Sequence, residues 1–152
     1  MNFETFCKFK DAETKRVNFE MTYVDMTNDL ISGLLLSQIV YWFSPSKNGK
    51  SKTRVTYKGR KAIAKGRSDW FDEIRISPKQ YDKAIKKLKD LGIVDVVNSL
   101  FNGMKTPFIM INEEVFIEKF VSTVEKPTVF TKGEYRSLPK GNTGLYQRGI
   151  PI

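Results

Sequence analysis

The segment from Ser77 to Gly92 combines the start and stop signals of a helix with a regular apolar pattern. Ser77 and Gln80 have the S-x-x-Q spacing of a capping box, and Pro78 occupies the first helical position. Gly92 stands where a helix commonly ends in a left-handed residue. Between these ends, apolar residues recur at the helical period: Tyr81, Ala84, Ile85, Leu88 and Leu91. The segment therefore predicts an amphipathic helix of about four turns that packs by this apolar stripe.

The opposite side of the predicted helix is basic. The helix carries five lysines: Lys79, Lys83, Lys86, Lys87 and Lys89. At about 100° per residue, Lys79, Lys83 and Lys86 lie within about 60° of one another and opposite the apolar stripe. A lysine face of this kind is also typical of any soluble amphipathic helix. Two interpretations therefore stand at this point, a surface for a polyanion and a merely solvated surface.

A short helix is predicted just before this segment. Residues 68–74 begin with Ser68, a capping residue that is followed by the acidic Asp69. We expect this helix to bury three apolar side chains, those of Trp70, Phe71 and Ile74. Only the short turn of residues 75–77 separates it from the capped helix, as a helix-turn-helix requires.

A β-hairpin is predicted just after the capped helix. Residues 93–97 and 106–111 are rich in β-forming side chains, and they flank a loop that contains Asn102-Gly103. Short helix, tight turn, capped basic helix and two-stranded hairpin follow one another as in the winged variant of the helix-turn-helix. The expected fold class is therefore α+β: a winged helix-turn-helix, whose helical core carries a small antiparallel β-hairpin wing, with an extended C-terminal tail.

The most apolar run of the chain predicts a central helix. Residues 30–43 are apolar on nearly all sides, with Thr27 as the expected cap, and Ser44-Pro45 ends the run. A bilayer span needs about 20 apolar residues, and this run is shorter, so we expect no membrane helix. Residues 60–65 predict a short strand, and Asn112 is expected to cap a further short helix over residues 113–120.

Three regions are expected along the chain. Residues 25–120 form the winged-helix domain. Residues 1–24 form an N-terminal arm, in which the weak alternation of RVNFEMTYV (16–24) indicates a strand or an extended segment. Residues 121–152 are polar and rich in proline and glycine, and so form a linker or tail. Because the chain ends in mid-pattern at RGIPI, we expect this tail to be the start of a missing C-terminal region.

The charge of the chain predicts an acidic partner. The formal net charge is +9 and the isoelectric point is near 9.6, which favours nucleic acid or an anionic membrane surface. Residues 47–67 alone contain nine lysine or arginine residues and no acidic residue. The charge and the order of the elements together predict binding to double-stranded DNA.

The residues expected to contact DNA follow from the geometry of the motif. The N-terminal part of the second helix lies nearest the base edges in a major groove, which makes Lys79, Gln80 and Lys83 the base-proximal candidates. The expected phosphate contacts are Lys86 and Lys87 on the helix, Arg60, Lys61, Lys65 and Arg67 before it, and Asn102 and Lys105 on the wing. Asp82 and Asp90 lie on or beside this face, and the helix has no arginine. Sequence specificity is therefore expected to be modest, or to reside in Gln80, in the wing or in DNA shape.

No pattern in the sequence predicts catalysis. The chain has no histidine, which excludes Ser-His and Cys-His nucleophile pairs and histidine-ligated metals. The stretch from Ser44 to Ser51 nearly matches a phosphate-binding G-x-x-x-x-G-K-[ST] loop, but Ser44 replaces the first glycine and a helix precedes it. The adjacent acids Asp72-Glu73 and Glu113-Glu114 are more simply helix caps. We expect no enzyme activity, no catalytic residue, no metal site and no cofactor.

The single cysteine and the aromatic residues have simple interpretations. Cys7 has no partner for an internal disulfide and is expected to be an inert thiol. This cysteine usage, together with an N-terminus that has no secretory pattern, indicates the reducing cytoplasm. Four aromatic residues in helical apolar patterns are expected in the core rather than as base-stacking platforms: Trp42, Phe43, Trp70 and Phe71.

Three segments carry a resemblance to a known family: GLLLSQIVYWF (33–43), AIAKGRSDWFDEIRISPKQYDKAIKKLKDLGIV (62–94) and NGMKTPFIMI (102–111). In their order, and in the Lys-Gly segments of the tail, the chain resembles the N-terminal domain of phage and plasmid replication-initiation proteins, the replisome organisers related to the DnaD-like primosome family. The resemblance implies binding to double-stranded origin DNA, often at repeats. It also implies recruitment of a helicase loader or helicase through regions beyond the winged helix. Such initiators usually continue into a C-terminal region, and we expect this region to be missing here.

Two other functions remain open at this point. A transcriptional regulator of the same fold would bind an operator as a symmetric dimer. A protein-protein interaction module of the replication machinery would use the winged helix to contact protein, with the lysines only solvating it. A homodimer is compatible with all three functions, since residues 1–24 either pair with another chain or fray.

Overall fold

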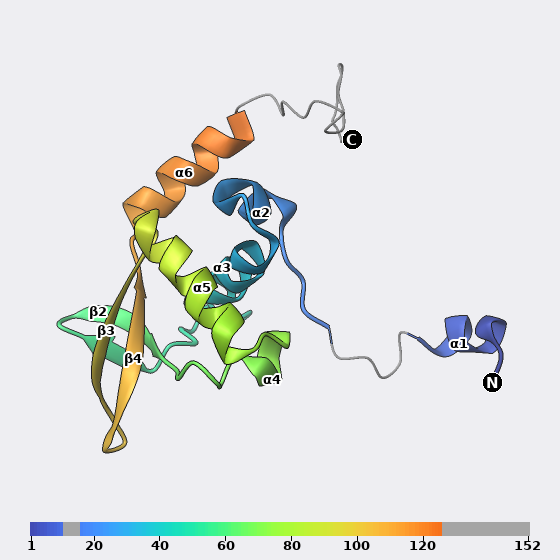
Figure 1. Ribbon diagram of the computed structural model, residues 1–152, viewed down its shortest axis with the longest axis horizontal. Helices are drawn as coiled ribbons and strands as arrows, with labels where there is room; N and C mark the ends of the chain where they lie inside the picture. The colour runs from blue at the N-terminus through green and yellow to red at the C-terminus, as the bar shows by residue number, and fades with distance from the viewer. Residues whose placement is uncertain (11–15, 126–152) are drawn as a thin grey trace. The chain divides into compact units, whose positions relative to one another are not determined.

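The computed structural model describes residues 1–10 and 16–125. Within these ranges the chain forms six helices and four strands. The helices are α1 (Phe3–Phe9), α2 (Met21–Thr27), α3 (Leu30–Phe43), α4 (Phe71–Ile74), α5 (Pro78–Asp90) and α6 (Glu113–Glu125). The strands are β1 (Val55–Tyr57), β2 (Arg60–Ala64), β3 (Val94–Phe101) and β4 (Met104–Ile111), in one antiparallel sheet of order β1-β2-β4-β3 (Figure 1). The α+β class predicted from the sequence is confirmed.

The chain divides into two units, Met1–Phe120 and Val121–Ile152. The first unit contains the sheet and the helices that cover it. The linker or tail was predicted over residues 121–152, but residues 121–125 continue α6. Residues 126–152, which contain the Lys-Gly segments, lie outside the described residues. No helix in residues 1–10 and 16–125 combines the length and the apolar character that crossing a membrane requires.

Helix α3 lies at the centre of the first unit, as its apolar sequence predicted. Its side chains Leu35, Leu36 and Ile39 have no solvent exposure. The expected cap was wrong: Asp29 caps α3 by accepting from the backbone N–H of Ser32 at 2.9 Å, and Thr27 is the last residue of α2. Asp29 is the better cap because it also accepts from the hydroxyl of Ser32, whereas the hydroxyl of Thr27 donates back into its own helix.

A strand or an extended segment was expected over residues 16–24, but residues 21–24 belong to helix α2, whereas residues 16–20 form no helix or strand. The helix ends at Thr27, and its C-cap Asn28 has a left-handed φ of 57°. Its inner side chains are Tyr23, Met26 and Thr27, which have the i, i+3, i+4 spacing of a helix face. The weak alternation of the sequence was misleading because tertiary packing determines the secondary structure of this segment. Helix α2 lies so close to α3 that a Cβ on Gly33 would be 2.7 Å from the Cα of Val24.

Helix α5 has the boundaries that the sequence predicted. Gln80 donates its backbone N–H to the Ser77 hydroxyl at 3.1 Å, and its side-chain oxygen accepts from the Ser77 N–H at 2.8 Å. At the other end, Ile93 donates to the carbonyl of Leu88 at 3.0 Å, and Gly92 has the left-handed φ of 78°. Four members of the apolar stripe are buried: Tyr81, Ala84, Ile85 and Leu88.

Helix α4 is shorter than predicted and is not capped by Ser68. Residues 67–70 form a turn in which Asp69 accepts from the N–H of Gly66 at 2.8 Å, and the helix begins only at Phe71. Because α4 has a single turn, Phe71 falls on its outer side and is half-exposed, contrary to the prediction, whereas Trp70 and Ile74 are buried as expected. Arg75 ends α4 with a φ of 60° and places its guanidinium over the Phe71 ring.

Two hairpins build the sheet. In the hairpin of β3 and β4, Asn102 and Gly103 form a two-residue turn with φ of 53° and 79°, as the tightest hairpins require. The hairpin was predicted, but its strands run right up to this turn and so exceed the predicted ones. The strand predicted at residues 60–65 is β2, paired with the unpredicted β1 through a second turn at Lys58-Gly59, which has φ of 49° and 83°.

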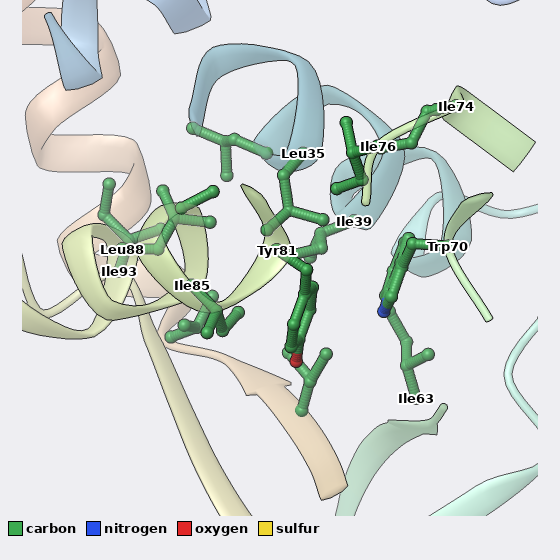
Figure 2. Close-up of a cluster of buried hydrophobic side chains, with 14 of the residues drawn as sticks. Leu35, Ile39, Ile63, Trp70, Ile74, Ile76, Tyr81, Ile85, Leu88 and Ile93 are labelled. Carbon is green, nitrogen blue, oxygen red and sulfur yellow. The ribbon is translucent and has the colours of Figure 1, made fainter. Parts of the chain in front are cut away.

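The two faces of the sheet belong to different clusters. Ile63 on β2 and Ile109 on β4 face the helices and join the main core with Trp70, Tyr81 and Leu88. Figure 2 shows these core side chains converging from α3, α5 and the strands. The other face has a smaller cluster of buried Ala62, Phe108 and Met110, which pack with Val55, Tyr57, Ala64 and Val97.

Helix α6 is longer than the helix predicted at residues 113–120, and the expected cap has another role. The Asn112 amide donates to the carbonyl of Gly92 at 2.8 Å, and its oxygen accepts from Arg60 at 2.8 Å. Asn112 therefore ties the end of the hairpin to the end of α5. Phe116 and Phe120 on α6 pack against Tyr23 of α2, with ring centroids 5.9 and 6.3 Å away.

Candidate nucleic-acid interface

The outer face of α5 is the best-defined basic surface in the described residues. Lys79, Lys83 and Lys86 are all exposed on it, while the apolar stripe on the other side is buried. Lys86 donates to Asp90 at 2.8 Å, one helical turn away, and this hydrogen bond raises the pKa of Lys86. Within the part of the chain that the structure describes, neither Lys79 nor Lys83 forms an ion pair. These two ammonium groups are therefore available to an external anion.

One flank of this face extends toward the start of α3. The pKa of Asp29 is lowered mainly by the hydroxyl and the backbone N–H of Ser32, and further by the positive charges of Lys87 and Lys83. The Lys87 side chain is half-buried. Gln80 lies on the same flank, and its side chain is exposed although its oxygen takes part in the capping box.

The other flank is organised by an ion pair between Arg67 and Asp82. The guanidinium donates to both carboxylate oxygens, from Nε at 3.0 Å and from Nη2 at 2.5 Å. These hydrogen bonds lower the pKa of Asp82 and raise that of Arg67. Asp82, which the sequence placed beside the basic face as an unfavourable charge, is thus neutralised by a residue from the turn before α4.

Lys65 lies at the edge of the core, and most of its side chain is buried. Its ammonium pairs with Glu73 of α4 and lies 5.1 Å from the ring centre of Trp42 and 5.5 Å from that of Trp70. Only a fifth of the Lys65 side chain is exposed, at 20%. Glu73 also accepts from the indole N–H of Trp42 and from the amide of Gln38, both at 2.8 Å. This cluster fixes α4 against α3 and β2, and so sets the position of the turn that leads into α5.

Arg60 connects the two hairpins. Its guanidinium donates to Asp95 on β3 at 3.0 Å and to the side-chain oxygen of Asn112 at 2.8 Å. Lys61, the next residue on β2, is exposed. Four residues before α4 were predicted to contact phosphates, and the structure divides them into two groups. Arg60, Lys65 and Arg67 have acidic partners within the fold, whereas Lys61 has none among the described residues.

The tip of the β3–β4 hairpin combines the predicted polar residues with an apolar pair that the sequence analysis did not single out. Asn102 lies in the turn and Lys105 on β4, and both are exposed. Leu100 lies directly across the hairpin from Lys105, and Met104 follows the turn; each is 71% exposed. The Asn102-Gly103 signal could have located them, because a two-residue turn fixes which residues flank it.

The aromatic residues expected in the core lie there, with the exception of Phe71. Trp70 is fully buried and stacks on Tyr81 with ring centroids 6.1 Å apart. Burial raises the pKa of the Tyr81 phenol. Trp42 and Phe43 are partly buried and pack against the main core. Among the described residues, the indole N–H of Trp70 has no hydrogen-bond partner.

The glycine-containing stretch from Ser44 to Ser51 connects α3 to β1 instead of joining a strand to a helix. Gly49 donates to the carbonyl of Ser46 at 2.8 Å and closes a turn. Lys52, just after it, donates to the carbonyls of Tyr41 and Ser44 at 3.0 and 2.8 Å and so caps the C-terminus of α3.

Comparisons with protein-family models, with curated proteins and with solved structures found no match. Among residues 1–10 and 16–125, no three His, Cys, Asp or Glu side chains are grouped so that they could hold a metal ion.

Proposed function

We propose that this chain binds double-stranded DNA, and that α4, α5 and the β3–β4 hairpin act as a winged helix-turn-helix. The observation that carries the proposal is the outer face of α5, where Lys79 and Lys83 are exposed and unpaired in the described residues, opposite a fully packed stripe. The chain order of short helix, left-handed turn at Arg75, capped helix and tight hairpin supports it.

In this proposal α5 occupies a major groove. A helix about 10–12 Å across fits a groove about 12 Å wide, with its N-terminal residues nearest the base edges. Lys79, Gln80 and Lys83 are then closest to the bases, and Lys86 and Lys87 face the phosphates. Lys61 and Lys105, which are exposed without an acidic partner in the described part of the chain, supply further phosphate contacts.

The ion-paired residues have a different role from the one expected. Lys65 and Arg60 act through the fold: the first holds α4 in place, and the second ties the hairpins together. Arg67 cancels the charge of Asp82, which would otherwise repel a phosphate backbone beside α5.

We further propose that this DNA binding serves replication initiation, in the cytoplasm and without chemistry of the chain's own. The support is the resemblance of residues 33–43, 62–94 and 102–111 to the N-terminal domains of phage and plasmid replication initiators. In that setting the DNA would be origin repeats, and a helicase loader or helicase would be recruited by regions beyond the winged helix. A transcriptional regulator would instead give a two-fold symmetric footprint, since its half-sites mirror a symmetric dimer.

The test is fluorescence anisotropy with a labelled random duplex of 25 base pairs, titrated with protein between 50 and 200 mM salt. We expect the logarithm of the affinity to fall with the logarithm of salt with a slope of about −4 or steeper, because each neutralised phosphate contributes about −0.9. The variant Lys79→Ala/Lys83→Ala should lose about tenfold or more at the lowest salt.

The matched control is Lys47→Ala/Lys50→Ala, which removes the same two charges from exposed positions in the loop after α3. If net charge alone governed binding, both double variants would lose affinity equally, and α5 would not be the interface. No binding by the wild type at 50 mM salt would refute DNA binding altogether, and salt-insensitive binding to a protein partner would then favour an interaction module.

A further inference from the structure

Only the inner half of the β3–β4 hairpin is packed against the rest of the fold. Val94 and the run from Phe108 to Met110 are buried, whereas the side chains beyond Val97 on β3 and before Thr106 on β4 are largely exposed. Four residues separate Val97 from the turn, which corresponds to about 14 Å of extended strand. The hairpin therefore ends in a free tip.

This tip is stiff. Its turn has only two residues, Asn102 and Gly103, both with positive φ, and the strand pairing continues without a break to Phe101 and Met104. The Phe101 ring packs edge-on against Phe108, with centroids 6.5 Å apart. The Thr106 hydroxyl donates to the carbonyl of Met104 at 3.0 Å. A tip held in this way can press side chains into a partner without first having to be ordered.

The surface of the tip is apolar and basic. Leu100 and Met104 are each 71% exposed, on opposite faces of the hairpin, and Lys105 stands beside Leu100. Residues 98–107 contain no acidic side chain. The nearest acid on the hairpin, Asp95, is already paired with Arg60. The tip therefore suits a partner that is negatively charged and that offers a narrow apolar site.

We propose that the tip inserts Leu100 and Met104 into the minor groove of the duplex bound by α5, where they wedge between base pairs and bend the DNA. This inference rests on the proposed function. Leucine and methionine are among the residues that partly unstack base steps in this way, and the kink that results brings more of the duplex against the protein. Lys105 then lies at the rim of the groove, where phosphates are.

The position of the hairpin tip agrees with contact to the same duplex as α5. In Figure 1 the hairpin and α5 both run downward from the start of α6 and diverge, the hairpin turn to the lower left and the N-terminus of α5 toward α4 at the lower centre. Adjacent major and minor grooves are separated by about half of the ~34 Å helical repeat. One duplex can thus meet α5 in one groove and the hairpin tip in the next.

A protein partner fits the tip less well. A stable protein interface buries about 800 Å² on each partner, which two side chains at the end of a narrow hairpin do not supply. A DNA wedge needs only one or two apolar side chains, because the stacked bases close on both sides of them.

The test measures DNA bending by ligase-mediated circle closure. A linear fragment of about 120 base pairs, shorter than the persistence length, closes poorly unless it is bent. We expect the full chain to raise the yield of circles several-fold at saturating protein. The variant Leu100→Ser/Met104→Ser should return the yield to that of DNA alone, while its duplex affinity by anisotropy falls less than about tenfold, because the lysine contacts are kept.

The matched control is Met21→Ser/Leu30→Ser, which changes the same two residue types at exposed positions on α2 and α3, with exposures of 77% and 60%. It should close circles as the wild type does. Far-UV circular dichroism checks that both variants keep the fold, which solvent-exposed substitutions are expected to preserve.

The results of these experiments distinguish failure of the proposed wedge from failure of the proposed DNA binding. A wild type that binds the duplex but closes no circles contradicts the wedge alone. Equal closure by the wild type and the tip variant also contradicts it, because the bend then originates elsewhere. A wild type that does not bind duplex DNA overturns the proposed function and the wedge together.

Discussion

Arg67 and Asp82 form a two-point ion pair beside the exposed face of α5, with the guanidinium bonded to both carboxylate oxygens. The pair joins the turn before α4 to the second turn of α5. Because both side chains are about half exposed, the pair matters more for the charge presented to a ligand than for stability.

Substitution of Asp82 by Asn should strengthen binding to duplex DNA. The change removes a negative charge beside Lys79 and Lys83 and frees Arg67 to meet a phosphate, so we expect affinity to rise about three- to tenfold at low salt. Anisotropy at 50 and 200 mM salt measures this. Arg67→Ala should have the opposite effect, since it exposes the Asp82 charge. Equal affinities for the wild type and both variants would show that this flank does not face DNA.

Substitution of Glu73 by Ala should destabilise the fold by about 2–4 kcal/mol, because it leaves the Lys65 ammonium and the Trp42 indole without their shared partner at a largely buried site. Urea denaturation at pH 7 measures the loss. Glu118→Ala, which removes an exposed acid from the middle of α6, is the control and should change stability by less than about 0.5 kcal/mol. A Glu73 variant as stable as this control would mean that the cluster does not hold α4.

Substitution of Gly33 by Ala should also destabilise the fold, by about 1–3 kcal/mol, because the new Cβ would lie 2.7 Å from the Cα of Val24. Thermal unfolding monitored by circular dichroism measures the effect. Val24→Ala should not rescue the variant, since the clash is with backbone atoms of α2 as well as with the side chain. Full rescue would show that α2 and α3 can separate without cost.

The cap of α3 should make stability depend on pH in the acidic range. Hydrogen bonds from Ser32 lower the folded-state pKa of Asp29, so this contribution is present above the unfolded pKa of about 3.9 and is lost as pH falls through the lower folded value. Asp29→Ala should cost about 1 kcal/mol at pH 7. Urea denaturation should show the gap between the wild type and this variant narrowing below about pH 4. A constant gap from pH 7 to pH 2 would contradict the assignment.

Elements whose signals are local could be predicted from the sequence. The limits of α5 depend on Ser77, Gln80 and Gly92, which act within a few residues of themselves. The β3–β4 hairpin depends on Asn102-Gly103 in the same way. β1 had no comparable signal, because lysine is not among the residues that favour the positive φ that Lys58 adopts in its turn. Helix α2 had no strong local signal, because its packing against α3 decides its structure.

In the candidate site, positions set by helical periodicity could be predicted, whereas ion-pair partners could not. Lys79, Lys83 and Lys86 lie where helical periodicity placed them. The inward position of Lys65 and the role of Arg60 could not be foreseen, since the partners of Arg60 lie 35 and 52 residues away in the chain. Whether a basic residue is free or paired is a property of the tertiary structure, which composition and spacing do not reveal.

The capping box also restricts how the Gln80 side chain could contact a base. To hold adenine, a glutamine must both accept from the N6 amino group and donate to N7. The Gln80 oxygen already accepts from the Ser77 N–H, so only its second lone pair is left for adenine N6, and the direction from which a base can approach is restricted. The amide nitrogen keeps its donors, which suit the N7 and O6 acceptors of guanine or the O4 of thymine. The hydrogen bond that begins the helix thus sets the orientation in which Gln80 can meet a base edge.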